Sequence, residues 1–304
     1  MPQDAPSVTF IGFGEAATAI ASGWLANIAI DCAAFDIKTD NADPAISTAK
    51  KDEYRAAGVT GHDTLPAALN PGTTVFSTVT PDQALIAATA AAQHLPLGAL
   101  YLDCNSCSPG TKRRAASVIE AAGGRYVDVA VMAPVHPALH RTPLLVSGPR
   151  ADAALDTLAR LDMSAKLADG PVGYASSIKM IRSIMVKGLE ALMVECVLAG
   201  RRAGVDEAVF DSLTKTIPGF DWPERAAYML ERVTTHGTRR AAEMREVATT
   251  LRELKLDGRM ADATADWQST IGDLMLDTNS SNYRIRADAI LSALDPPHNQ
   301  RALP

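Results

Sequence analysis

The fold is decided near the N-terminus by the stretch Ser7-Val8-Thr9-Phe10-Ile11-Gly12-Phe13-Gly14-Glu15-Ala16-Ala17. Its first five residues are mostly apolar or β-branched and predict a buried strand, and the alanine-rich residues after Glu15 predict a helix. Between them, Gly12 permits a tight turn, and Gly14 lets the backbone approach a pyrophosphate at the helix N-terminus. This G-x-G-x-x-A pattern predicts a dinucleotide-binding unit in which Gly12, Phe13, Gly14, Glu15 and Ala16 contact the cofactor.

A second predicted strand ends in Asp36, 22 residues (36 − 14) after Gly14. A carboxylate in this place hydrogen-bonds the ribose 2′-hydroxyl of NAD and repels the 2′-phosphate of NADP. Asp36 therefore favours NAD as the cofactor. Lys38 keeps NADP as an alternative cofactor, because a cation two residues after Asp36 could pair with a 2′-phosphate. A glycine-rich turn that binds nothing is the alternative interpretation of the whole pattern.

The first half of the chain alternates short apolar or β-branched runs with alanine-rich helical stretches, which is typical of βαβ units. Asp43-Pro44 and Ser108-Pro109 predict helix starts, and glycine follows each of these helices. We expect an α/β fold: a Rossmann-type N-terminal domain with a mostly parallel sheet at residues 1–170. The strands are expected at 7–11, 30–35, 74–79, 99–103, 126–131 and 144–147.

After Asp169-Gly170-Pro171 the strand pattern ends and helix-forming sequence follows. We expect an all-α domain at residues 171–304, with the domain boundary at these three residues. Its helices are expected at 175–203, 224–233, 238–254 and 261–276.

The composition of the chain limits the kinds of partner that the protein is expected to bind. Hydrophobic residues make up 47% of the chain and charged residues 21%, and the net charge of −6 provides no basic stripe for nucleic acid. No apolar run approaches the roughly 18 residues of a membrane span, and the N-terminus lacks the basic start of a signal peptide. Four cysteines are too few for a disulfide framework. We therefore expect no membrane partner, a cytoplasmic location and reduced thiols.

Two more strand ends should bring loops to the carboxyl edge of the sheet, where doubly wound folds bind ligands. The first loop carries Val79 and Thr80, which we expect to contact the cofactor. The second carries Cys104-Asn105-Ser106-Cys107.

This C-x-x-C could be a redox pair or half of a zinc site, but no second cysteine pair accompanies it. We expect no metal and interpret the cysteines as small residues at a strand end, and a thiol redox protein remains an alternative.

His136 and His140 are four residues apart, but Pro137 lies between them and indicates a loop rather than a metal-binding helix face. His136 follows the strand of Asp128 near the expected active edge, so it is a candidate substrate contact. A surface or structural histidine is the simpler interpretation.

The helix expected after the boundary carries polar residues on one face. Lys179, Arg182, Ser183, Lys187 and Glu190 fall at i, i+3, i+4, i+8 and i+11 of an otherwise apolar helix. One interpretation is a solvated face. The other is a largely buried helix whose polar stripe faces a cleft, where burial and the neighbouring Arg182 would lower the pKa of Lys179. Such a lysine could take a proton from a substrate hydroxyl.

These features, in this order, resemble the β-hydroxyacid dehydrogenase superfamily, which includes 3-hydroxyisobutyrate and 6-phosphogluconate dehydrogenases. The stretch from Ser177 to Leu192 resembles the phosphogluconate-dehydrogenase-like oxidoreductases that carry a C-terminal helical domain of unknown function. The resemblance implies that Lys179 is the catalytic acid/base, at the end of a G-x-x-x-x-x-K motif that starts at Gly173. It also implies substrate contacts, for which the candidates are Asn105, Ser106, Ser183, Arg182 and His136.

The chain departs from the family pattern where the substrate binds. Met132, Ala133 and Pro134 stand where the family has a serine and two glycines, and Ser183 replaces an asparagine. The substrate is therefore expected to differ from a standard small 3-hydroxyacid.

The resemblance implies NAD(P)-dependent hydride transfer to or from a hydroxyl-bearing small molecule, and a homodimer built through the helical domain. An imine reductase and a non-catalytic NAD-binding sensor are the alternatives. A cluster on a later helix (His236, Arg239, Arg240 and Glu243) either enters the site or forms a solvated charged face.

Overall fold

The computed structural model describes residues 6–69, 74–277 and 280–295. The chain divides into two compact units, Met1–Met180 and Ile181–Pro304. The division falls inside the long helix α7 (Tyr174–Ala203), whose first turns belong to the first unit. The boundary expected after residue 170 lies earlier, at the loop that precedes this helix.

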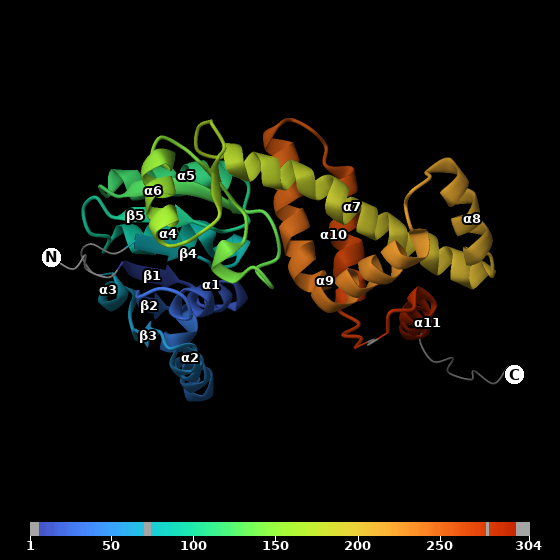
Figure 1. The fold of residues 1–304 in the computed structure, drawn as a ribbon, viewed down its shortest axis with the longest axis horizontal. Coiled ribbons are helices and arrows are strands. Elements are labelled where there is room, and N and C mark those ends of the chain that lie inside the picture. Colours follow the sequence, from blue (N-terminus) through green and yellow to red (C-terminus); the bar gives the residue numbers. More distant parts are fainter. Residues whose placement is uncertain (1–5, 70–73, 278–279, 296–304) are drawn as a thin grey trace, which may run out of the picture. The chain divides into compact units, whose positions relative to one another are not determined.

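The first unit contains an eight-stranded sheet (Figure 1). The strand order is β3-β2-β1-β4-β5-β6-β7-β8, and β7 alone pairs antiparallel, with β6. This confirms the predicted Rossmann-type, mostly parallel sheet, in which the order reverses between β1 and β4. The strands are β1 (Ser7–Ile11), β2 (Asp31–Phe35), β3 (Thr60–Gly61), β4 (Thr74–Ser77), β5 (Leu100–Asp103), β6 (Arg125–Val131), β7 (Leu144–Ser147) and β8 (Ala165–Leu167). The expected strands omitted β3 and β8, which are too short to show a pattern.

Successive side chains of the central strands enter two different cores. Phe10, Phe76 and Leu102 lie in one hydrophobic cluster, whereas Ile11 and Val75 lie in the other. Helices therefore cover both faces of the sheet, as the period of two along each strand requires. They are α1 (Glu15–Leu25), α2 (Pro44–Ala57), α3 (Leu65–Ala68), α4 (Ala84–Ala92), α5 (Pro109–Ala121) and α6 (Ala151–Arg160).

Helix caps follow the sequence signals. Asp43 accepts a hydrogen bond from Ala45 N at the start of α2, and Gly58 ends that helix with φ of +70°. Ser108 accepts from Thr111 N at the start of α5. Both helix starts are as predicted.

In the described part of the second unit, helices joined by loops are the only regular secondary structure. It contains the rest of α7 and the helices α8 (Asp206–Thr216), α9 (Trp222–Glu253), α10 (Arg259–Gly272) and α11 (Tyr283–Leu294). The expected break between residues 233 and 238 was wrong, because α9 runs through it. Gly237 in that stretch is where α9 crosses α10: a Cβ there would lie 2.3 Å from Gln268 O. The glycine permits close packing of two helices and does not end one.

Among the described residues, no helix combines the length and the apolar character that crossing a membrane requires.

Candidate active site

The glycine fingerprint lies at the carboxyl end of β1, between β2 and β4. Gly12 has φ of +83°, and a Cβ there would lie 2.7 Å from Val79 Cγ1 and 3.0 Å from Thr78 O. A side chain would meet both backbone strain and an occupied space, so this position requires glycine. Gly14 is the N-cap of α1, and a Cβ on it would meet no atom within 4 Å. The open space at Gly14 and the first-turn N–H groups of α1 fit a dinucleotide pyrophosphate.

Phe13 shapes this loop through its backbone. Its side chain is fully buried and packs edge-on against Tyr54. Its N–H donates to Asp36 Oδ2 at 2.8 Å, and Lys50 Nζ donates to its carbonyl oxygen at 2.8 Å. Any contact from Phe13 to a cofactor is therefore limited to backbone atoms.

Asp36 follows β2 and stands beside the fingerprint. Its second oxygen, Oδ1, accepts from Lys38 N at 3.0 Å, so backbone donors hold the carboxylate in place. The Lys38 side chain is exposed. In the first turn of α1, Glu15 is exposed, Ala16 is half-buried and Ala17 is fully buried against the sheet. The small side chain of Ala17 allows that close packing, as the fingerprint predicts.

The loops after β4 and β5 are tied together by Asn105. Its Oδ1 accepts from Val79 N at 2.7 Å, and its Nδ2 donates to Ser77 Oγ at 2.9 Å. The residue is buried, so a substrate that contacts Asn105 must compete with both bonds. Thr80, next to Val79, is exposed. The structure thus links the expected cofactor loop to the expected substrate loop through one amide.

Ser106 and Lys179 are the two expected site residues that the structure joins directly. Lys179 Nζ donates to Ser106 Oγ at 2.5 Å, within the first unit and at partial burial. An amine within hydrogen-bond distance of a hydroxyl is an arrangement that general acid–base catalysis can use.

A buried charged network lies behind this pair, and the sequence did not reveal it. Lys112, Asp103 and Asp128 are all fully buried. Lys112 Nζ lies 3.0 Å from Asp103 Oδ1 and 3.5 Å from Asp128 Oδ1. Lys112 is the fourth residue of α5, and a lysine on a helix is ordinarily solvated, so nothing in the sequence indicates its burial. The one signal in the sequence is that Asp103 and Asp128 lie in two consecutive expected strands.

The two cysteines of the C-x-x-C are free and buried. Burial raises the pKa of the Cys104 thiol to about 12. Since the thiolate is the reactive form, Cys104 is a poor redox nucleophile near neutral pH. Within the described residues, no group of three or more His, Cys, Asp or Glu side chains is arranged to hold a metal.

The polar stripe of α7 divides at the boundary between the units. In the second unit Lys187 Nζ pairs with Glu243 Oε2 at 2.8 Å and donates to Ser183 Oγ at 3.2 Å. Glu190 pairs with Arg240 on α9. This part of the stripe is buried against α9, whereas apolar side chains of α7 are exposed. Both interpretations of the stripe, a solvated face and a face toward a cleft, were therefore wrong for this part, because ion pairs bury the polar face against α9.

Two further candidates lie on surfaces. Arg182 is exposed on α7, and His136 is exposed in the loop after β6. Both side chains are accessible to a ligand. Ser183, in contrast, is buried.

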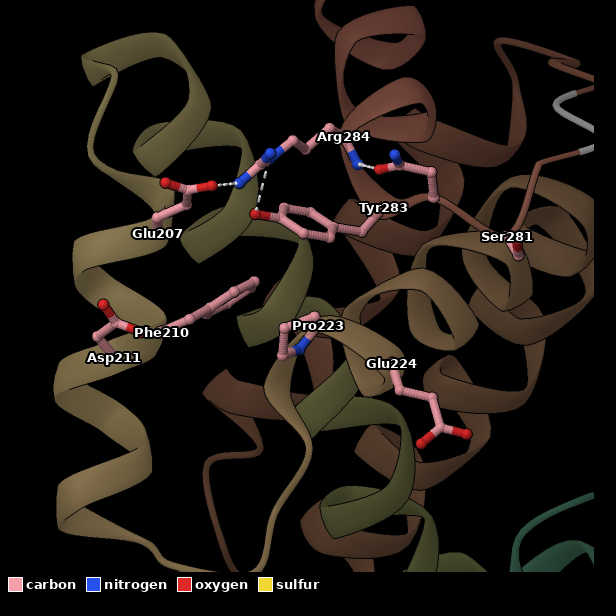
Figure 2. Close-up of a pocket in the computed structure, with 9 residues that line it drawn as sticks. Glu207, Phe210, Asp211, Pro223, Glu224, Ser281, Tyr283 and Arg284 are labelled. Atoms are coloured by element: carbon pink, nitrogen blue, oxygen red, sulfur yellow. Dashed lines mark hydrogen bonds and ion pairs between the residues drawn. The ribbon is translucent and has the colours of Figure 1, made fainter.

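The second unit has a pocket of about 720 Å³ between α8, the start of α9 and the start of α11 (Figure 2). Its lining residues are Glu207, Phe210, Asp211, Pro223, Glu224, Ser281, Asn282, Tyr283 and Arg284. None of them is an expected site residue. Arg284 reaches across to Glu207 and to the hydroxyl of Tyr283, so its charge is already engaged (Figure 2).

Comparison with family models places two domains on the chain. Residues 7–166 match the NAD-binding domain of 6-phosphogluconate dehydrogenase, and residues 201–271 match a domain of unknown function (DUF1932). A protein of Methanothermus fervidus, an uncharacterised 28.5 kDa protein in the 7S RNA 5′ region, is 28% identical over 142 residues. That match covers 47% of this chain and 53% of the relative, so the chain spans about half the length of the curated relative it matches.

Solved structures match over nearly the whole chain. A conserved hypothetical protein from Sinorhizobium meliloti 1021 is 37% identical, with a TM-score of 0.75, over 95% of this chain and 96% of that one. A conserved protein of unknown function, described as structurally similar to 3-hydroxyacid dehydrogenases, is 31% identical, with a TM-score of 0.68, over 92% and 99%.

Mycobacterium tuberculosis 3-hydroxyisobutyrate dehydrogenase shares the fold at 13% identity, with a TM-score of 0.70, over 96% of this chain and all of that one (100%). The match to the family models confirms the predicted resemblance and the dinucleotide cofactor, NAD(P). The chain belongs to the family defined by the NAD-binding domain of 6-phosphogluconate dehydrogenase, and it joins that domain to a C-terminal domain of unknown function.

Proposed function

We propose that this protein is an NAD-dependent oxidoreductase that transfers a hydride between the nicotinamide and a hydroxyl-bearing small molecule, in particular a hydroxy acid. The observation that carries the proposal is the Lys179–Ser106 hydrogen bond at the same sheet edge as the glycine fingerprint. An acid/base amine and a dinucleotide site are the two parts that alcohol oxidation needs.

Lys179 acts as the acid/base. In the oxidative direction its neutral amine accepts the substrate hydroxyl proton while the hydride leaves the same carbon, so the alcohol becomes a carbonyl. In the reductive direction the ammonium returns the proton to the carbonyl oxygen. Ser106, already within 2.5 Å of Nζ, orients the substrate oxygen toward the amine. A nicotinamide cofactor held at the loop of Gly12 and Gly14 would supply the hydride acceptor or donor.

Two candidate substrate contacts are exposed side chains. We expect each of them, Arg182 and His136, to supply a cationic or hydrogen-bonding group for a carboxylate. Asn105 and Ser183 are buried and act through the loops and the helix that they stabilise. Met132, Ala133 and Pro134 make the adjoining loop more apolar than the family motif, which favours a substrate with an apolar side group.

Thermal stability with NAD, NADH, NADP and NADPH, followed by a library of hydroxy acids and alcohols, tests this function. A ligand that binds only the native state raises the melting temperature, by several degrees (on the order of 5 °C) at a hundredfold excess over Kd. We expect a shift with NAD or NADH that one substrate class enlarges.

Turnover of that class should then fall at least about a hundredfold in Lys179→Ala, the lower range for a lost acid/base group. Full turnover by Lys179→Ala would exclude this mechanism. Turnover of imines in place of alcohols would indicate an imine reductase, and NAD binding without any turnover would indicate a sensor.

We further propose a cytoplasmic homodimer formed through the helical domain. Ile181, Met185, Leu189 and Leu192 form an apolar stripe on α7 that is 43% to 63% exposed, which is the kind of surface that a partner covers. The free cysteines fit a reducing compartment. Met185→Glu should yield monomers in analytical ultracentrifugation, whereas Leu97→Glu, at an exposed site in the first unit, should not. A monomeric wild-type protein would contradict the proposed dimer.

A further inference from the structure

The buried cation Lys112 lies between the two segments that carry Ser106 and Lys179. It stands on α5, fully buried, and its Nζ donates to the Asp103 carbonyl oxygen at 2.6 Å and to Asp103 Oδ1 at 3.0 Å. It also lies 3.5 Å from Asp128 Oδ1 and from the Val129 carbonyl oxygen. One amine thus contacts both the carboxyl end of β5 and the middle of β6.

The Asp103 side of this bridge orders the loop that carries Ser106. Asp103 Oδ1 accepts from Asn105 N at 3.0 Å, and Oδ2 accepts from the Tyr126 hydroxyl at 2.7 Å. Asn105 in turn accepts a hydrogen bond from Val79 N and donates one to Ser77 Oγ. The position of Ser106, the next residue, therefore follows from how Asp103 is held.

The Asp128 side orders the helix that carries Lys179. Asp128 Oδ2 accepts from Gly173 N and Ser176 N, both at 3.1 Å, and from Ser147 Oγ at 3.0 Å. Asp128 Oδ1 accepts from Ser176 Oγ at 2.5 Å. These donors include N–H groups in the first turn of α7, which have no partner within the helix. Asp128 thereby anchors α7 one turn before Lys179.

Both carboxylates are fully buried and would repel each other without a cation between them. Burial acts to lower the pKa of Lys112, but the charges of Asp103 and Asp128 outweigh burial and hold that pKa above its ordinary value. The amine therefore remains charged and able to bridge at neutral pH.

We propose that Lys112 is a positioning residue: by bridging Asp103 and Asp128 it holds the Ser106 loop and the start of α7 at the separation that lets Lys179 donate to Ser106. The catalytic importance of this role rests on the proposed function, but the positioning itself does not. It is measured through the chemical reactivity of Lys179, which needs no substrate.

The experiment is the pH dependence of acetylation of Lys179 by acetic anhydride, followed by peptide mass spectrometry, with the exposed Lys166 as internal reference. Ser106→Ala removes the hydroxyl that accepts from Lys179 Nζ. Its pH profile of acetylation is therefore the reference for a Lys179 that has lost this contact. Lys112→Met alone strands two buried carboxylates and risks misfolding. Lys112→Met/Asp103→Asn keeps the net charge of the three groups at −1, because it removes one charge of each sign.

Asp103→Asn alone is the matched control, since Lys112 still reaches the Asp103 carbonyl oxygen and Asp128. We expect Asp103→Asn to shift the Lys179 profile less than the double variant does, because it weakens one side of the bridge but keeps the cation. The double variant should approach Ser106→Ala, with about a tenfold change in rate at fixed pH for each unit by which the Lys179 pKa moves. NADH binding and the melting transition confirm that each variant is folded.

A milder pair tests the bridge from the helix side. Ser176→Ala removes one donor to Asp128, whereas Ser177→Ala removes a hydroxyl that bonds Gly173 O instead. Ser176→Ala should shift the Lys179 profile in the direction of Ser106→Ala, and Ser177→Ala should not. Wild-type Lys179 reactivity in the folded double variant and in Ser176→Ala would overturn the proposal. Turnover by Lys179→Ala would instead remove the proposed function and leave the positioning result standing.

Discussion

Lys179 Nζ lies 2.5 Å from Ser106 Oγ, although 73 positions separate the two residues in the chain. The contact joins the loop after β5 to the first turns of α7. Both segments meet at the carboxyl edge of a parallel sheet, where the fingerprint loop also lies, so the acid/base candidate and the cofactor loop share one edge.

Removal of the Ser106 hydroxyl should reduce catalysis without weakening cofactor binding. In Ser106→Ala we expect kcat to fall about 10- to 100-fold, since a hydrogen bond to a charged or reacting group is worth about 1.5–3 kcal/mol. The Kd for NADH, measured by fluorescence, should stay unchanged. Ser117→Ala, on the exposed side of α5, is the control. Loss of NADH binding in Ser106→Ala would instead place Ser106 in the cofactor site.

Asp36 should decide between the two nicotinamide cofactors. Removal of its carboxylate in Asp36→Ala takes away both the ribose acceptor and the charge that repels a 2′-phosphate. We expect the ratio of Kd values for NADP and NAD to fall at least about tenfold, which corresponds to roughly 1.4 kcal/mol. Asp40→Ala, an exposed aspartate four residues away, should leave the ratio unchanged. An unaltered ratio in Asp36→Ala would contradict the assigned role.

The crossing of α9 and α10 should not tolerate a side chain at Gly237. A Cβ there would lie 2.3 Å from Gln268 O and 2.7 Å from Gly272 Cα, so Gly237→Ala must separate two backbones. We expect a loss of about 2–3 kcal/mol in urea unfolding. Gly188→Ala is the matched variant on α7, where the nearest atom is 3.9 Å away. It should be neutral or stabilising by about 0.5–1 kcal/mol, because alanine favours the helix. Equal stability of both variants would show that the crossing is loose.

The acid stability of the second unit should depend on Asp206. Burial alone would raise the pKa of Asp206, but hydrogen bonds from Tyr283 and Arg284 and the charge of Arg201 outweigh it and hold the pKa below its ordinary value. A depressed folded-state pKa stabilises the fold above the unfolded-state pKa, and this contribution disappears as the pH falls through the folded value.

Asp206→Asn should therefore lower the free energy of unfolding by about 2 kcal/mol at pH 7, with the difference from wild type shrinking below about pH 4. Urea unfolding at a series of pH values measures this difference. Asp211→Asn, an exposed site on the same helix, should have little effect at any pH. A difference that grew toward acid pH would contradict the sign of the shift.

The sequence by itself determined the parts whose conformation depends on neighbours in the chain. The local features are the strand–turn–helix around Gly12 and Gly14, the helix starts at Asp43 and Ser108, and the strand that precedes Asp36. Turns and caps are made by residues a few positions apart, so their patterns can be recognised without a tertiary structure. The alternation of strands and helices then predicted the mostly parallel sheet.

Only the tertiary structure decided which polar residues are buried and with which partners. The stripe of Ser183, Lys187 and Glu190 was visible in the sequence, but its burial depends on charges of opposite sign on α9, at least 50 residues later. Lys112 gave no signal, because a lysine on a helix is ordinarily solvated. It becomes a bridge because the strand pairing places Asp103, at the end of β5, beside Asp128, in the middle of β6. Periodicity shows which face of a helix is polar, whereas burial of that face requires compensating charges that only the packing of distant segments provides.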